Sequence, residues 1–259
     1  MSHPHFDAFA RTPAQAGLFL DFDGVLADIA PEPDAATIRF GIADLLVALS
    51  ARLGRVAVIS GRPVAYLDAM VPAAVDIVGL YGLEARRQGV HSTLEEAETY
   101  RETVGELVAS ATSLFGGAVI EPKGLSLTIH YRSDEALAAP MEAWVSEQAA
   151  RTGMEPRPAK RSFELHPPIH RDKGTALIEL AEGLDPVAYF GDDVGDLPAF
   201  DGLDVLARRG IATIRVAVDS SEAPASLKDR ADVVADGPAG AETLLRQILA
   251  AAGTPTDQD

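Results

Sequence analysis

Two acidic clusters in the sequence each come directly after a short apolar run. Asp21-Phe22-Asp23-Gly24 follows Gly17–Leu20, and Gly191-Asp192-Asp193-Val194-Gly195-Asp196 follows Val187–Phe190. The carboxyl ends of parallel strands form the edge at which open α/β sheets bind ligands. Carboxylates gathered there repel one another unless protons or a cation compensate them. Mg²⁺ takes carboxylate oxygens from few protein ligands, so the two clusters predict a Mg²⁺ site.

Each cluster also has a plainer interpretation. Asp and Gly are favoured in turns because of their backbone preferences, and turn or cap chemistry would account for Asp193 or Asp196 taken singly. Turns do not explain why two such clusters would end strands of one sheet, where their repulsion would be uncompensated. We therefore favour the metal site.

Hydrogen-bond donors and positive charge follow at two other places. Ser60-Gly61-Arg62 comes after the apolar run Val56–Ile59, and Lys173-Gly174 opens a predicted helix with Asp172 as its N-cap. A serine hydroxyl, glycine amides, a helix start and an ammonium group all suit a phosphoryl group. A single Lys in an acidic chain is more often a solvated charge. Lys173 therefore supports a phosphate site only because of its place in the order of the other motifs along the chain.

Composition excludes several classes of protein. The 259 residues contain 22 Lys and Arg against 39 Asp and Glu, which gives a net charge of −17. Such a surface repels nucleic acid and anionic membranes, so we expect neither as a partner. The absence of cysteine excludes disulfides, thiolate-bound zinc and a cysteine nucleophile. We find no secretory signal in the first 20 residues and no apolar run near the ~18 residues of a membrane span, and expect a cytoplasmic protein.

Apolar runs alternate with helical patterns over most of the chain. This alternation predicts an α/β fold with a Rossmann-like parallel sheet. The expected strands are Gly17–Leu20, Val56–Ile59, Ile77–Leu80, Val187–Phe190, Ile214–Val218 and Val233–Ala235, and the expected helices include Ala36–Leu53, Thr175–Gly183 and Ala239–Ala252.

The middle of the chain interrupts this alternation. We expect one long helix over Thr93–Phe115 with Thr93 and Glu96 as its capping box, a turn at 122–124, and a strand over Leu125–Arg132 with strictly alternating polarity. A helix over Glu135–Thr152 and a strand over Ser162–Leu165 follow, with His166 and His170 in loops. These elements predict an inserted α+β domain over residues 88–168, flanked by a core of residues 1–87 and 169–259.

The order Asp-x-Asp-Gly, Ser, insertion, Lys and Gly-Asp-Asp resembles that of the haloacid dehalogenase-like phosphatases over the whole chain. The resemblance implies a nucleophile at Asp21 and a general acid and base at Asp23. It further implies an inserted cap that closes over the site. It implies Mg²⁺ bound by Asp21, the backbone carbonyl of Asp23 and Asp192, and a phosphoryl group held by Ser60 and Lys173, with Gly24, Gly61 and Arg62 beside them.

The inserted segment is similar to one family within that superfamily. Glu121–Arg132, which reads EPKGLSLTIHYR, resembles the Glu-x-Lys … His-Tyr-Arg segment of trehalose-6-phosphate phosphatases. Tyr81–Glu84 and Phe163–Pro167 resemble two further segments of that family. The resemblance implies trehalose 6-phosphate as substrate and a functional link to a trehalose-phosphate synthase. It assigns the sugar hydroxyls to Glu121, Lys123, His130, Arg132 and Glu164, although the polar face of a sheet can also simply be solvated.

One segment departs from the family pattern. The family often reads Gly-Asp-Asp-x-Thr-Asp-Glu, whereas this chain has Gly195 and Leu197 at the Thr and Glu positions. Asp192 is unaffected by this change. Asp193 and Asp196 are expected to support the metal ligands from behind, without the help of those two side chains.

The resulting hypothesis is Mg²⁺-dependent hydrolysis of trehalose 6-phosphate through an aspartyl-phosphate intermediate. A phosphatase of the same superfamily acting on sucrose 6-phosphate or a glycosyl-phosphoglycerate would share the core motifs. A non-enzymatic phospho-acceptor of the response-regulator type also uses Asp, Ser or Thr, and Lys, but its acidic pair precedes a separate acceptor Asp. A binding protein that has lost activity is disfavoured by the intact pair Asp21 and Asp23.

Overall fold

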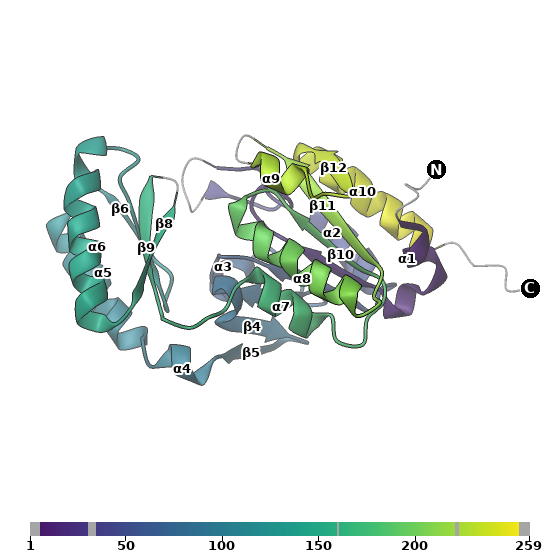
Figure 1. Ribbon diagram of the computed structural model, residues 1–259, viewed down its shortest axis with the longest axis horizontal. Coiled ribbons are helices and arrows are strands. Elements are labelled where there is room, and N and C mark those ends of the chain that lie inside the picture. The colour runs from purple at the N-terminus through teal and green to yellow at the C-terminus, as the bar shows by residue number, and fades with distance from the viewer. Residues whose placement is uncertain (1–5, 31–34, 160, 221–222, 254–259) are drawn as a thin grey trace, which may run out of the picture. The chain divides into compact units, whose positions relative to one another are not determined.

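An eight-stranded sheet forms the first part of the computed structural model, which describes residues 6–30, 35–159, 161–220 and 223–253. The strand order is β12-β11-β10-β1-β2-β3-β4-β5 (Figure 1). Its parallel strands are β1 (Gly17–Leu20), β2 (Arg55–Ile59), β3 (Asp76–Gly79), β10 (Val187–Gly191), β11 (Thr213–Asp219) and β12 (Val233–Asp236); β4 (Glu84–Arg87) runs antiparallel to β3, and β5 (Val90–Thr93) lies at the edge.

Helices cover both faces of this sheet, which is why its central strands are apolar throughout. Leu18 and Leu20 of β1 pack into one core, whereas Phe19 packs into the other. The first core holds α1 (Asp7–Arg11), α2 (Ile42–Ser50), α3 (Val64–Leu67) and α10 (Gly237–Ala252), and the second holds α7 (Lys173–Leu180), α8 (Leu197–Arg208) and α9 (Ala225–Lys228). The predicted α/β fold with a Rossmann-like parallel sheet is therefore confirmed.

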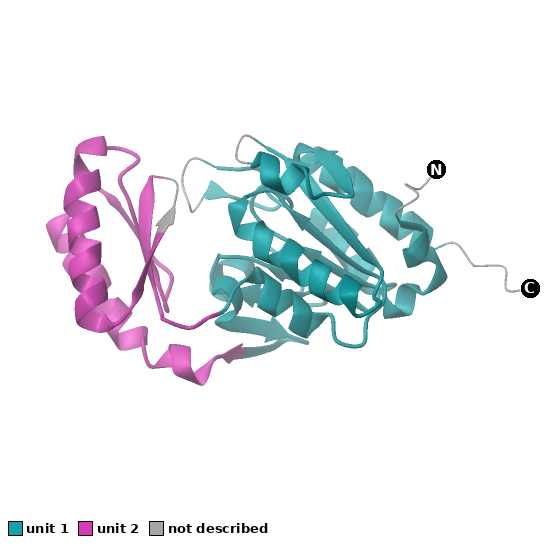
Figure 2. Cartoon of the chain, viewed as in Figure 1, with its two compact units in different colours: residues 1–91, 171–259 teal, residues 92–170 magenta. Residues whose placement is uncertain are grey.

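A second compact unit comprises residues 92–170, and residues 1–91 and 171–259 make up the first (Figure 2). Its antiparallel sheet has the order β6-β7-β9-β8, formed by β6 (Val119–Pro122), β7 (Leu127–His130), β9 (Ser162–His166) and β8 (Glu155–Ala159). After α4 (Glu95–Glu98), the helices α5 (Arg101–Leu114) and α6 (Ala138–Thr152) cover one face of it. That this unit acts as a cap stays a prediction.

The alternation of apolar and polar residues predicted along 125–132 places the two kinds of side chain on opposite faces of the second unit's sheet. Leu127 and Ile129 of β7 and Leu165 of β9 face the helices, where they pack with Trp144 and Leu107. The opposite face is polar and carries Ser126, Thr128, His130 and Glu164.

Two predicted helices are wrong at their starts. Thr93 is the last residue of β5, and two separate helices, α4 and α5, follow where one long helix was predicted. The predicted capping box of Thr93 and Glu96 is absent, because no side chain caps α4. The helix predicted from Ala36 begins only at Ile42, because Ile38 pairs with Ala27 in a β-bridge and Gly41 has φ of 80°. Short 3₁₀ turns at Pro13–Gln15, Leu80–Gly82, Glu135–Leu137 and Val194–Asp196 complete the elements.

The position of His166 corrects another prediction. It was expected in a loop, but it is the last residue of β9, opposite Glu155, and is fully buried. The alternation of β9 simply continues one step past Leu165. His170, also expected in a loop, lies between β9 and α7 as predicted. Among the described residues, no helix combines the length and apolarity needed to cross a bilayer.

Candidate active site

The strand order brings the two acidic clusters together. β1 and β10 are parallel neighbours with Leu20 opposite Phe190, and the backbone N–H of Asp21 donates to the Phe190 carbonyl at 2.9 Å. Asp192 follows β10 by one residue, and Ser60 follows β2, the neighbour of β1 on its other side. All three side chains therefore lie at one edge of the sheet.

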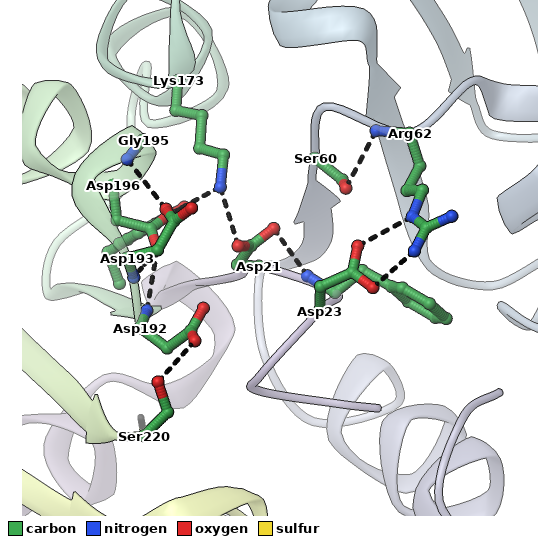
Figure 3. Close-up of polar contacts among 12 residues, drawn as sticks. Asp21, Asp23, Ser60, Arg62, Lys173, Asp192, Asp193, Gly195, Asp196 and Ser220 are labelled. Atoms are coloured by element: carbon green, nitrogen blue, oxygen red, sulfur yellow. Dashed lines mark hydrogen bonds and ion pairs between the residues drawn. The ribbon is translucent and has the colours of Figure 1, made fainter. Parts of the chain in front are cut away.

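Lys173 supplies the positive charge among these carboxylates. Its buried ammonium group lies 2.7 Å from Asp21 Oδ2 and 2.7 Å from Asp196 Oδ1 (Figure 3). Lys173 is the first residue of α7, and the N-cap predicted at Asp172 is confirmed by its reciprocal capping box with Thr175. Burial by itself would lower the pKa of Lys173, but Asp196 and Asp21 together raise that pKa well above its ordinary value. The side chain is thus held as an ammonium ion.

Asp196 organises the loop after β10. Its fully buried carboxylate accepts from Lys173 and from the Tyr189 hydroxyl (2.6 Å) on Oδ1. On Oδ2 it accepts from the backbone N–H groups of Asp192 (2.7 Å) and Asp193 (3.1 Å). A carboxylate has about four lone-pair sites, so these four bonds leave Asp196 as a support and not as a metal ligand.

Asp21 and Asp192 are buried with their oxygens less fully engaged. Asp21 Oδ1 accepts from the Phe22 backbone N–H at 2.7 Å and its Oδ2 pairs with Lys173. Asp192 Oδ2 accepts from the Ser220 hydroxyl at 3.0 Å. Each carboxylate therefore retains lone pairs that could bind a cation.

The positive charge next to these carboxylates is too small to balance them. Burial, followed by the charges of Asp196 and Asp193, raises the pKa of Asp192 to about 7 despite the hydrogen bond from Ser220. Burial also raises the pKa of Asp21 well above its ordinary value, although Lys173 opposes the shift. One ammonium ion does not compensate three buried acids, and a bound cation would favour their ionised forms.

The donor set fits a divalent cation. One oxygen each from Asp21, Asp192, Asp193 and Asp196 lies within 4.8 Å of the others. With Asp196 saturated, Asp21 and Asp192 remain as hard oxygen ligands, which suits Mg²⁺ chemistry. Gly24 is required beside them: it has φ of 69°, and a Cβ there would lie 2.1 Å from Asp192 Oδ2.

Asp23 has a different environment from Asp21. Arg62 binds its carboxylate side-on, from Nε to Oδ2 and from NH2 to Oδ1, both at 2.8 Å (Figure 3). Ser60 Oγ accepts from the Arg62 backbone N–H at 3.1 Å. Gly61 packs under the Tyr81 ring, where a Cβ would lie 2.7 Å away. Arg62 was predicted to contact phosphate, and here it binds Asp23.

The polar face of the second unit holds most of the predicted sugar-binding residues. Glu164 accepts from the Ser126 hydroxyl at 2.8 Å, and Lys123 Nζ lies 3.6 Å from it. His130 Nε2 lies 3.0 Å from Glu121 Oε2. Four of the five predicted residues thus form two pairs: Glu121 of β6 with His130 of the adjoining β7, and Lys123, just after β6, with Glu164 of β9.

Sequence reasoning misplaced or missed several residues. Arg132 was expected within a strand over Leu125–Arg132, but it lies beyond the end of β7 and its side chain is exposed. Tyr189 and Ser220, which support Asp196 and Asp192, were not predicted. The signal for Tyr189 was available, because a tyrosine in a strand covered on both faces needs a buried partner for its hydroxyl. No comparable signal marks Ser220.

Comparisons with known sequences match most of the chain to a family model and to individual relatives. Residues 19–234 match the family model described as Trehalose-phosphatase. A probable trehalose-phosphate phosphatase of Sinorhizobium fredii is 34% identical over 223 residues, covering 81% of this chain and 82% of that protein. An uncharacterized glycosyl hydrolase of Mycobacterium tuberculosis is 35% identical over 215 residues, covering 74% of this chain but only 15% of that protein. The chain thus corresponds to a small part of that longer relative.

Solved structures share the fold at low sequence identity. A trehalose-6-phosphate phosphatase related protein superposes with a TM-score of 0.77 and 20% identity, covering 90% of this chain and 97% of that one. A haloacid dehalogenase-like hydrolase from Bacteroides thetaiotaomicron gives 0.61 and 18%, covering 89% and 98%. The likeness to the haloacid dehalogenase-like fold is therefore confirmed.

We expect added Mg²⁺ to raise the unfolding temperature more at about pH 8 than at about pH 6. Folded Asp192 holds its proton up to a pKa of about 7, whereas the unfolded chain releases that proton near the ordinary value. The contribution of Asp192 to the stability of the metal-free protein therefore falls as the pH rises from the ordinary Asp pKa toward about 7. In that range the folded state binds more protons than the unfolded state does. A cation must displace the proton at low pH and need not do so at high pH.

Thermal unfolding with and without Mg²⁺ measures this effect, with an expected shift of about 2–4 °C per kcal/mol of binding free energy. Asp192→Asn serves as the control and should lose most of the Mg²⁺ shift. Equal shifts at both pH values, or a full shift in Asp192→Asn, would show that the cation does not bind this cluster.

Proposed function

We propose that this chain, which belongs to the trehalose-phosphatase family as its sequence resemblance predicted, hydrolyses trehalose 6-phosphate to trehalose and phosphate. The observation that carries the proposal is the placement of Asp21, buried at the end of β1 against the Lys173 ammonium and beside Asp192. A carboxylate nucleophile needs a fixed orientation and a cationic surrounding to accept a phosphoryl group.

Asp21 is the proposed nucleophile. Bonds from the Phe22 backbone N–H and from Lys173 fix its two oxygens. One of them attacks phosphorus in line, the bond from phosphorus to the sugar oxygen breaks, and an aspartyl phosphate forms. The electron pair of that bond goes to the sugar oxygen, which takes a proton from Asp23. Water then attacks phosphorus, gives a proton to Asp23, and releases inorganic phosphate with Asp21 restored.

Phosphoryl charge is stabilised by fixed donors in this proposal. The Lys173 ammonium group, the Ser60 hydroxyl and the backbone amides of Gly24 and Gly61 are assigned to the phosphoryl oxygens. Ser60 Oγ accepts from the Arg62 backbone, and its own hydrogen is then available to donate. Mg²⁺ bound by Asp21, Asp192 and, from the family resemblance, the Asp23 carbonyl would add positive charge and favour ionised Asp21.

Recognition of the sugar is proposed for the polar face of the second unit. Glu121, Lys123, His130, Arg132 and Glu164 together offer donors and acceptors to sugar hydroxyls. The pairing of Lys123 with Glu164 supports this role, because both side chains are largely buried and charged. Such a substrate must come from a reaction that builds a phosphorylated disaccharide, and we propose a trehalose-phosphate synthase as the functional partner.

The proposal predicts Mg²⁺-dependent phosphate release with a strong preference for trehalose 6-phosphate. The comparison substrates are sucrose 6-phosphate, glucose 6-phosphate and 4-nitrophenyl phosphate, each measured with Mg²⁺ and with EDTA. Asp21→Asn should lower kcat at least about 10³-fold, because the amide cannot form the covalent intermediate. Its thermal unfolding serves to show that it is folded. Preference for another ester would show that the proposed substrate is wrong. Unchanged activity in Asp21→Asn would exclude Asp21 as the nucleophile.

Lys123→Ala should separate sugar recognition from phosphoryl transfer. We expect KM for trehalose 6-phosphate to rise about tenfold, equivalent to about 1.4 kcal/mol or one charged hydrogen bond. KM for 4-nitrophenyl phosphate, which has no sugar, should stay within about twofold. Lys228→Ala is the matched control, since Lys228 pairs with Asp219 on the exposed surface of the first unit. An equal rise in KM for both substrates would exclude a sugar-binding role for Lys123.

A further inference from the structure

We infer that Arg62 is a positioning residue that orients Asp23 toward the leaving-group oxygen, in place of the phosphate contact predicted for it. The inference rests on the proposed function, since it concerns the proton donor of that reaction. It follows from the bidentate pair between the two side chains and from the way the surrounding loops hold Arg62.

The pair fixes the plane of the Asp23 carboxyl group. Nε and NH2 of Arg62 each lie 2.8 Å from a different oxygen of Asp23. Two parallel N–H···O bonds define the plane as well as the position of a carboxylate. The terminal torsion of an Asp side chain otherwise has a broad distribution. With a third of its side chain exposed, Asp23 depends on Arg62 for a fixed direction.

Arg62 is itself held from several sides. Its side chain is mostly buried, and its guanidinium carbon lies 4.6 Å from the centre of the Tyr66 ring. The Tyr66 hydroxyl donates to the Ala36 carbonyl at 2.6 Å, which fixes the ring. The Arg62 backbone donates to Ser60 Oγ at 3.1 Å and accepts from the Leu80 N–H at 3.1 Å. Both ends of the residue are therefore tied to neighbouring loops.

A strained backbone segment supports the same loop. Leu80 and Tyr81, directly after β3, have φ of 49° and 59°, in the left-handed region that is unfavourable for residues other than glycine. The Tyr81 N–H donates to the Ser60 carbonyl at 3.1 Å, and its ring covers Gly61. These contacts join the strained segment to residues 60 and 61 of the loop that carries Arg62.

The two possible roles of Arg62 differ in their chemical consequence. The guanidinium nitrogens that bind Asp23 are the ones with which Arg62 could bind a phosphoryl group side-on, so one set of donors cannot serve both at once. If Arg62 acts through Asp23, its loss impairs proton transfer to the leaving oxygen. A sugar alkoxide needs that proton, whereas 4-nitrophenolate leaves without it. If Arg62 binds the phosphoryl group, both esters are affected equally.

The test compares these two leaving groups in single turnovers, with enzyme in excess over substrate. Arg62→Lys keeps the positive charge but loses the two parallel N–H donors that bind Asp23 side-on. We expect release of trehalose from trehalose 6-phosphate to slow by about 10–100-fold and release of 4-nitrophenolate by less than about threefold. Arg246→Lys is the matched control: Arg246 also uses Nε and NH2 to bind one carboxylate, Glu242, on the exposed surface of α10. It should leave both rates unchanged.

A double-mutant cycle with trehalose 6-phosphate adds an independent readout. Once Asp23→Asn has removed the carboxylate, Arg62→Lys should slow the enzyme by no more than about twofold further, because the two residues act as one unit. Should Arg62→Lys fail to fold, Arg62→Ala with added guanidinium ion replaces it, and rescue confined to the sugar ester is expected.

The outcomes separate this inference from the function on which it rests. Equal slowing of both esters, or additive losses in the cycle, would overturn the positioning role and return Arg62 to the phosphoryl group. A wild-type protein that releases phosphate only from another sugar ester would overturn the proposed substrate, and the comparison then uses that ester. A folded wild type that hydrolyses no phosphate ester would overturn the proposed function and this inference with it.

Discussion

One buried ammonium group faces three buried carboxylates, and the rest of the site depends on that imbalance. Lys173 pairs with Asp21 and Asp196, while Asp192 lies beside them with its pKa raised to about 7. A buried charge is tolerated only where partners compensate it, so the fold must place α7, β1 and β10 together. Because negative charge is in excess at this site, the site attracts cations. In the proposed function, a bound cation is what lets a chain with a net charge of −17 take a phosphate dianion at this site.

Two aspartates only two residues apart are given different surroundings. Asp21 is buried against Lys173, whereas Asp23 is partly exposed and bound side-on by Arg62. A reaction that needs a nucleophile and a separate proton donor benefits from such a division, because each carboxyl group can then follow its own environment. Gly24, in the left-handed region, turns the chain immediately after the pair and lets it approach Asp192. The family membership and this division of environments support the same reaction class.

The parts of this structure that could be predicted from sequence are those governed by periodicity and topology. Continuous apolar runs located the parallel strands, and the rule that ligands bind at the carboxyl edge of such a sheet brought Asp21, Asp192 and Ser60 together. Contacts between distant side chains have no such signal, so the role of Ser220 and the pairing of Arg62 with Asp23 could not be predicted. The helices named from the sequence do not include α8. Gly202 lies within it because a Cβ would meet the Gly174 carbonyl of α7 at 3.0 Å.

The central claim is that Asp21 carries the phosphoryl group during turnover. Trapping tests it most directly: the enzyme is mixed with trehalose 6-phosphate and Mg²⁺, quenched in acid within one turnover, digested and mapped by mass spectrometry. The account predicts one added phosphoryl group on the peptide that contains Asp21, sensitive to hydroxylamine as an acyl phosphate is, and absent from Asp21→Asn. Phosphate released in a full turnover with no labelled peptide, or with the label on Asp192 or Ser60, would contradict it.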